Sequence, residues 1–180
     1  MIDAMHHIRK AIIDRLTGNI THNGSPVSIY NVIPKNASYP LIRIYSVSSN
    51  EIDQNQTTFN SEILTRVEVV TRFSGDDGGE LSANRLISDC LNLLRTRSDG
   101  YFDLSANGLK VYVVENNGIT YLTDNFSDHT YHRAIMDLSV INKKPIGNGI
   151  ITCLNMKQAK IRRKKGAEAA DAVNSVLSQK

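Results

Sequence analysis

Alternation of apolar and charged side chains between residues 63 and 73 is the feature that most constrains the fold of this chain. One set of alternate positions suits a covered face and comprises Ile63, Thr65, Val67, Val69, Thr71 and Phe73. The positions between them include the charged residues Arg66, Glu68 and Arg72. Because successive side chains of a β-strand point to opposite faces, the pattern predicts a strand in an antiparallel sheet that is covered on one face.

Two other stretches predict helices. Residues 1–16 carry apolar side chains at three- and four-residue spacing, which is typical of an amphipathic helix, and Gly18 suits its end. A second helix is predicted after the Gly- and Asp-rich turn at residues 74–79. Its apolar stripe comprises Ala83, Leu86, Ile87, Cys90, Leu91 and Leu94.

Further strands are predicted at residues 41–47, 109–114, 119–122 and 131–141. Residues 48–61 are almost entirely polar and predict an exposed loop or a protruding hairpin. Residues 116–118 (Asn-Asn-Gly) predict a hairpin turn. The order of elements predicts an α+β domain over residues 1–145, with a mainly antiparallel sheet and two helices packed on one face. Residues 146–180 are predicted to be a linker and a basic, helix-permissive C-terminal extension.

Charge is distributed unevenly along the 180 residues. Residues 156–180 contain seven basic and two acidic side chains, whereas residues 1–155 contain 14 basic and 16 acidic ones. The mildly acidic body argues against nucleic-acid binding by the globular part. No apolar run approaches the length of a membrane span, and the charged N-terminus does not resemble a signal peptide, so we expect an intracellular protein without a membrane partner.

The sequence offers no recognisable catalytic, cofactor or metal site. His129 and His132 are three apart on a predicted strand and therefore point to opposite faces, which disfavours joint metal ligation. Cys90 lies on the apolar stripe of its helix and is predicted to be a buried, inert thiol. We therefore expect no catalytic residue, no cofactor and no metal, and a protein that is not an enzyme; an enzyme of unknown type stays as an alternative.

A basic arm stands out near the C-terminus, formed by Lys157, Lys160, Arg162, Arg163, Lys164 and Lys165. One interpretation is a solvated, frayed extension. The other is an arm that docks on an acidic partner or on nucleic acid, where it becomes helical.

The order of elements over residues 1–145 resembles the tail-completion, or tail-terminator, proteins of long-tailed bacteriophages. The resemblance depends on a proline-bounded segment at residues 32–44, a polar excursion at residues 48–61, and the sequence Val-Val-Thr-Arg-Phe-Ser at residues 69–74, which runs through a Gly/Asp turn into a helix. A last long strand at residues 131–141 closes the domain.

The resemblance implies a structural virion protein of the tail or neck. Such a protein forms a ring, usually of six subunits, that caps the tail tube, ends its growth and joins the tail to the head connector. Its partners would be copies of itself, the tail tube protein, a connector or neck protein, and DNA that passes through the lumen without specific binding. The alternative is a nucleic-acid-binding accessory protein that uses the basic arm.

Candidate contact groups for such a ring lie on the polar face of the sheet and in the polar excursion. On the sheet they are Arg66, Glu68, Arg72, Arg133 and Asp137. In the excursion they are Asn50, Glu51, Asp53 and Thr58. For each of them, an ordinary solvated side chain is the competing interpretation.

Overall fold

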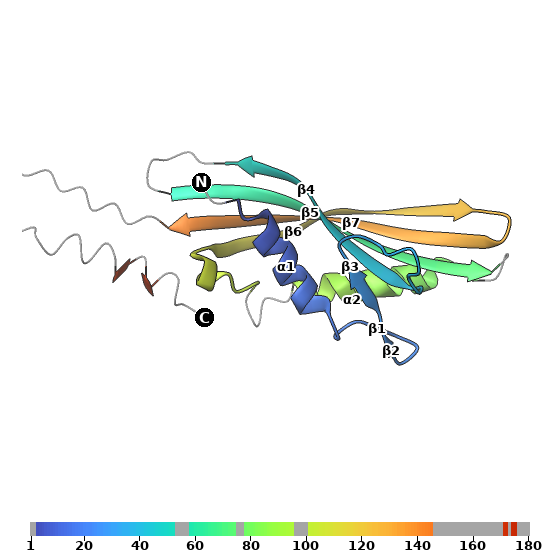
Figure 1. The fold of residues 1–180 in the computed structure, drawn as a ribbon. Coiled ribbons are helices and arrows are strands. Elements are labelled where there is room, and N and C mark those ends of the chain that lie inside the picture. Colours follow the sequence, from blue (N-terminus) through green and yellow to red (C-terminus); the bar gives the residue numbers. More distant parts are fainter. Residues whose placement is uncertain are drawn as a thin grey trace, which may run out of the picture.

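The predicted strand at residues 63–73 forms the middle of a longer strand, β5 (Thr58–Ser74), at the centre of a five-stranded sheet (Figure 1). The structure is a computed structural model that describes residues 3–52, 58–74, 78–95, 101–145, 171–172 and 174–175. The strand order is β3-β4-β5-β7-β6, and every pairing is antiparallel except the parallel pair β3–β4. The other strands are β3 (Ser28–Tyr30), β4 (Leu41–Glu51), β6 (Lys110–Asn125) and β7 (His129–Pro145).

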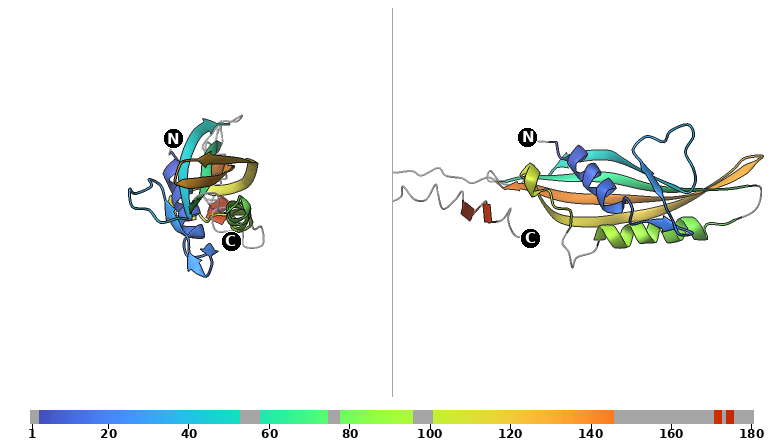
Figure 2. Two further views of the ribbon diagram at one scale, coloured as in Figure 1. Left: turned by 90° about the vertical axis from the view of Figure 1, so that its right-hand side faces the viewer. Right: turned by 60° about the horizontal axis from the view of Figure 1, so that its bottom comes forward.

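Helices α1 (Met5–Leu16) and α2 (Leu81–Arg95) both pack against one face of this sheet (Figure 2). In α1, the four-residue spacing of Ile8, Ile12 and Leu16 places three fully buried side chains along one stripe. These side chains join one core with α2 and with alternate positions of the central strands, such as Val67 in β5 and Met136 in β7. Smaller elements are β1 (Thr21–His22), β2 (Ser25–Pro26) and η1 (Ser105–Asn107).

The prediction of an α+β fold with two helices and a mostly antiparallel sheet is confirmed. Alternate residues of β5 from Ile63 to Thr71 are buried, as the alternation requires. Among the described helices, none is both long and apolar enough to cross a membrane. The division at residue 145 stays a prediction.

The structure decides between the two alternatives for one predicted loop and corrects another. The polar excursion at residues 48–61 follows the hairpin alternative and not the loop, because β4 continues to Glu51, β5 begins at Thr58 and the two strands pair antiparallel. Backbone pairing extends these strands although their side chains are polar, as at Asn50, which lies opposite Glu62.

The predicted hairpin turn at residues 116–118 is a bulge inside the continuous strand β6. The register of β6 against β7 shifts between Asn116 and Ile119, and Gly118 has a φ of 137°, a conformation that suits glycine. The Asn116 side chain accepts a hydrogen bond from the Gly118 backbone N–H at 3.0 Å. The hairpin turn lies instead between the end of β6 and the start of β7, where the Phe126 N–H donates to the His129 carbonyl at 2.9 Å.

Alanine substitutions of apolar side chains on α2 test how the helix packs against the sheet. Leu94 is fully buried, so Leu94→Ala should lower the free energy of unfolding by about 2–5 kcal/mol. Leu91 is only partly buried at the margin of the core, so Leu91→Ala should cost about 1 kcal/mol. Urea denaturation measures both. Equal losses for the two variants would contradict the orientation of α2.

The buried thiol predicted at Cys90 is confirmed, since Cys90 is free and fully buried among core side chains. Burial, helped by the charge of Asp89, raises the pKa of this thiol to about 12. At pH 8, the reactive thiolate should therefore be far rarer than for an ordinary cysteine. In a Cys153→Ser variant, a thiol reagent should modify Cys90 slowly in the native protein and rapidly in denaturant. Rapid native modification would contradict the packing of α2.

Candidate functional site

Polar side chains from four strands gather on the face of the sheet opposite the helices. The register places Arg43 of β4 opposite Glu68 of β5, and Arg66 of β5 opposite Asp137 of β7. Val70 of β5 lies opposite Arg133 of β7. Because side chains on directly and diagonally opposed positions of antiparallel strands are within reach of one another, these charges form pairs across the strands.

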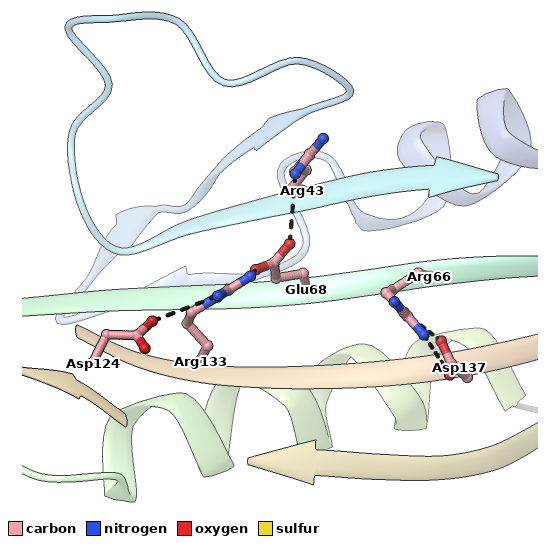
Figure 3. A network of polar contacts seen from close by, with 6 residues as sticks. All are labelled: Arg43, Arg66, Glu68, Asp124, Arg133 and Asp137. Atoms are coloured by element: carbon pink, nitrogen blue, oxygen red, sulfur yellow. Dashed lines mark hydrogen bonds and ion pairs between the residues drawn. The ribbon is translucent and has the colours of Figure 1, made fainter. Parts of the chain in front are cut away.

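Glu68 is the centre of one such network (Figure 3). Its side chain is only 3% exposed, although it carries a carboxylate on the helix-free face. The Arg133 Nε donates to Glu68 Oε1 at 2.6 Å, and a second nitrogen of the same guanidinium also pairs with that oxygen. Arg133 also forms an ion pair with Asp124 at 3.5 Å, and Arg43 Nη1 lies 3.9 Å from Glu68 Oε2.

These contacts change the acid–base properties of Arg133. Burial disfavours its charged form, but the hydrogen bond and charge of Glu68, together with Asp124, outweigh this effect and raise the pKa of Arg133. The guanidinium of Arg133 therefore stays charged and remains paired with the carboxylates of Glu68 and Asp124.

A second pair lies one row further along the sheet. Arg66 donates two hydrogen bonds to the two carboxylate oxygens of Asp137, at 2.6 and 2.9 Å (Figure 3). The hydrogen bonds that Arg66 makes with Asp137 and Tyr45 raise the pKa of Arg66 above its ordinary value. Both side chains of this bidentate pair are about one third exposed, so the pair adds little stability. Its fixed geometry favours the observed register of β5 against β7.

A pocket of about 460 Å³ opens beside the Glu68 network. Its volume lies in the range typical of small-molecule sites. The pocket is lined by residues of the proline-bounded segment, the sheet face and the β6–β7 turn: Ile33, Tyr39, Arg43, Glu68, Val70, Asp124, Phe126, Ser127, Asp128, His129, Tyr131 and Arg133. We call this the Glu68 pocket.

Three aromatic rings form a connected wall of the Glu68 pocket. The rings of Tyr39 and Tyr131 meet edge to face with centroids 5.6 Å apart, and those of Phe126 and Tyr131 do so at 5.7 Å. Phe126 is 65% exposed, so its ring is presented to solvent and available to a ligand. The Glu68 pocket therefore combines the flat apolar surface of these rings with the paired charges of Glu68 and Arg133.

Several polar atoms of the pocket are buried without a hydrogen bond. They are Glu68 Oε2, Arg43 Nε and His129 Nδ1; within the described part of the chain, only Thr65 and Asn84 contribute further such atoms. Buried polar atoms are normally paired, so a cluster of unpaired ones calls for an explanation. Their gathering around one cavity marks the Glu68 pocket as the candidate site.

The structure brings together some of the residues predicted as contact groups. Arg66, Glu68, Arg133 and Asp137 are joined in the ion pairs described above. Arg72 lies nearby, with its guanidinium 4.7 Å above the ring of Tyr39.

The other predicted contact groups are not part of this site. Asn50 and Glu51 are exposed at the end of β4. Thr58 begins β5, but its side chain lies outside the described residues, as do Asp53 and the basic arm. Whether any of these residues contacts a second subunit stays a prediction.

Sequence reasoning missed Arg43, Asp124 and the aromatic wall. Arg43 interrupts an apolar run in the predicted strand at residues 41–47, and this was a usable signal. The position of Phe126 and His129 in a turn beside the sheet face had no signal in the sequence, because it depends on where β6 ends.

The described residues contain no group of three His, Cys, Asp or Glu side chains close enough to hold a metal ion. His132 lies on the core side of β7, where its Nδ1 is 3.1 Å from Thr123 Oγ1, whereas His129 lines the Glu68 pocket on the other face. The prediction that the two imidazoles point to opposite faces is therefore confirmed.

Comparison with known proteins shows a partial similarity to a family of enzymes. The family model of 6,7-dimethyl-8-ribityllumazine synthase matches residues 117–180. The 6,7-dimethyl-8-ribityllumazine synthases of two strains of Methylorubrum extorquens are each 47% identical to this chain over 53 residues. That stretch covers 27% of this chain and 31% of each relative, so the chain spans less than a third of the relatives' length.

This finding corrects the interpretation drawn from the order of elements. The matching family is a synthase family and not the tail-terminator proteins, so the assignment as a structural virion protein that caps a tail tube is wrong. The motifs that suggested it were short apolar patterns, which many sheets share. The expectation of a protein that is not an enzyme is corrected for the same reason.

The same match, which runs through residues 157–165, corrects the alternative of a nucleic-acid-binding accessory protein. Whether the basic arm docks on a partner stays a prediction. The expected partners and location in a virion are tested by none of these observations. What the comparisons add is that the β6–β7 turn and β7, which supply much of the Glu68 pocket, belong to a segment similar to a ribityllumazine synthase.

Proposed function

We propose that this chain binds a ribityllumazine-type molecule, a flat heterocycle with a polyol chain, in the Glu68 pocket. One observation carries the proposal: seven of the twelve lining residues fall within the segment that is similar to 6,7-dimethyl-8-ribityllumazine synthase. They are Asp124, Phe126, Ser127, Asp128, His129, Tyr131 and Arg133.

The chemistry of the lining suits such a ligand. A flat heterocycle stacks on aromatic side chains such as Phe126 and Tyr131. Its ring N–H groups and the hydroxyls of a ribityl chain are hydrogen-bond donors, for which the Asp124 and Asp128 carboxylates are acceptors. Arg43 can donate to a ring carbonyl through its unpaired Nε.

The proposal extends to chemistry on that ligand, since the relatives are named as synthases. His129 is the imidazole of the lining, and we propose it as the group that exchanges a proton with the ligand. Its Nδ1 is buried and forms no hydrogen bond, so the proposed exchange requires the ligand to reach this nitrogen or the other ring nitrogen, Nε2.

Titration of the full chain with 6,7-dimethyl-8-ribityllumazine, followed by ligand fluorescence or calorimetry, tests the proposal. We expect saturable binding with one site per chain. Phe126→Ala removes an exposed ring of the wall and should weaken binding about tenfold with little effect on stability. The matched control is Tyr112→Ala, which removes an exposed ring outside the pocket and should leave binding unchanged. Absence of binding, or equal losses in both variants, would refute the proposal.

A further inference from the structure

We infer that the Glu68 pocket selects its ligand by charge: it takes uncharged or cationic ring-and-polyol compounds and rejects their phosphorylated counterparts. The inference rests on the proposed function, whose ligand class it narrows. It follows from how the charges of the lining are already paired.

The lining contains two guanidinium groups and three carboxylates. Arg133 is committed to Glu68 and Asp124, and Arg43 lies nearest to Glu68 Oε2 while its guanidinium is 4.5 Å from the centre of the Tyr45 ring. Arg133 is therefore not held ready for an incoming anion, and the three carboxylates of the described lining outnumber its two guanidinium groups. Asp128, exposed in the β6–β7 turn, adds a negative charge at the mouth of the pocket.

The unpaired oxygen of Glu68 also favours a hydrogen-bond donor over an anion. Oε2 is an acceptor in a side chain that is only 3% exposed, and it has no hydrogen bond. A ligand N–H or O–H that displaced Arg43 slightly would satisfy it, whereas a phosphate oxygen would face it with like charge. The pocket is thus complementary to donors and not to anions.

Arg72 is the nearby cation that could oppose this selection. It is exposed, does not line the pocket, and lies over the outer ring Tyr39. If it captured a phosphate at the rim, phosphorylated ligands would bind more tightly, so the experiment includes Arg72→Gln.

The test compares riboflavin with riboflavin 5′-phosphate, which differ only by the phosphate, by calorimetry on the full chain. We expect riboflavin to bind about tenfold more tightly, since each nearby carboxylate repels a dianion by a few-fold in affinity at physiological salt. Asp128→Asn should reduce that ratio about threefold. Asp89→Asn, which removes an exposed carboxylate on α2, should leave it unchanged.

A second probe pair keeps the inference independent of the ligand proposed above. Proflavine is a flat cation and 1-pyrenesulfonate a flat anion, and only the part of their binding that Phe126→Ala removes is assigned to the pocket. We expect this part to be present for proflavine and absent for the sulfonate. If neither riboflavin nor the ribityllumazine binds, the proposed function fails while the dyes still decide the charge preference. The inference would be overturned if riboflavin 5′-phosphate bound as tightly as riboflavin or more tightly, whether or not Arg72→Gln reduced the affinity for the phosphate. Binding of the sulfonate in the pocket would also overturn it.

Discussion

Replacing Arg133 with methionine is expected to lower the free energy of unfolding by about 3 kcal/mol. The substitution keeps much of the side-chain volume but leaves the Glu68 carboxylate, which is only 3% exposed, without its main partner. Breaking a buried ion pair from one side typically costs about 3–5 kcal/mol. We place the loss at the lower end of that range because Arg43 remains 3.9 Å away and the pocket admits water. Urea denaturation at pH 7 measures it.

Two further variants separate this effect from a general loss of charge. Arg66→Met breaks the partly exposed pair with Asp137 and should cost about 1 kcal/mol. The double variant Glu68→Leu/Arg133→Met removes the stranded carboxylate and should recover most of the stability lost in Arg133→Met. If Arg133→Met destabilises no more than Arg66→Met, Glu68 is not the buried centre of the network.

Val69→Asp should prevent folding altogether. Val69 is fully buried in the core between the helices and the sheet, and an unpaired carboxylate there costs more than the whole stability of a typical domain. The matched control is Val47→Asp in β4, where the side chain is 44% exposed and the same change should cost about 1 kcal/mol or less. Far-ultraviolet circular dichroism and gel filtration distinguish the two outcomes. A folded Val69→Asp variant would refute the assigned faces of β5.

The parts of the fold that could be predicted from the sequence are those with a periodic apolar pattern. The alternation from Ile63 to Phe73 predicted both the central strand and its covered face, and the spacing from Ala83 to Leu94 predicted α2. The extension of β4 through Asn50 was not predictable in this way, since backbone pairing with β5 holds it and its side chains remain exposed.

The candidate site was predictable only in part. The charged positions 66 and 68 identified the polar face, but the pairing of Glu68 with Arg133 is diagonal and depends on a register that no local pattern defines. The pocket needs in addition the β6–β7 turn and the segment that carries Tyr39. These three parts are far apart in the sequence, so only the tertiary structure brings them together.

The bulge in β6 has a consequence for the solubility of the folded chain. Within the described residues, β6 is the outermost strand next to β7, and an exposed strand edge is a template on which foreign chains add and grow into fibrils. The irregular stretch between Asn116 and Ile119 divides that 16-residue edge into two short pieces, each too brief for a long, uninterrupted ladder. By the general behaviour of strand edges, the interruption at Asn-Asn-Gly should disfavour the addition of a foreign strand along β6.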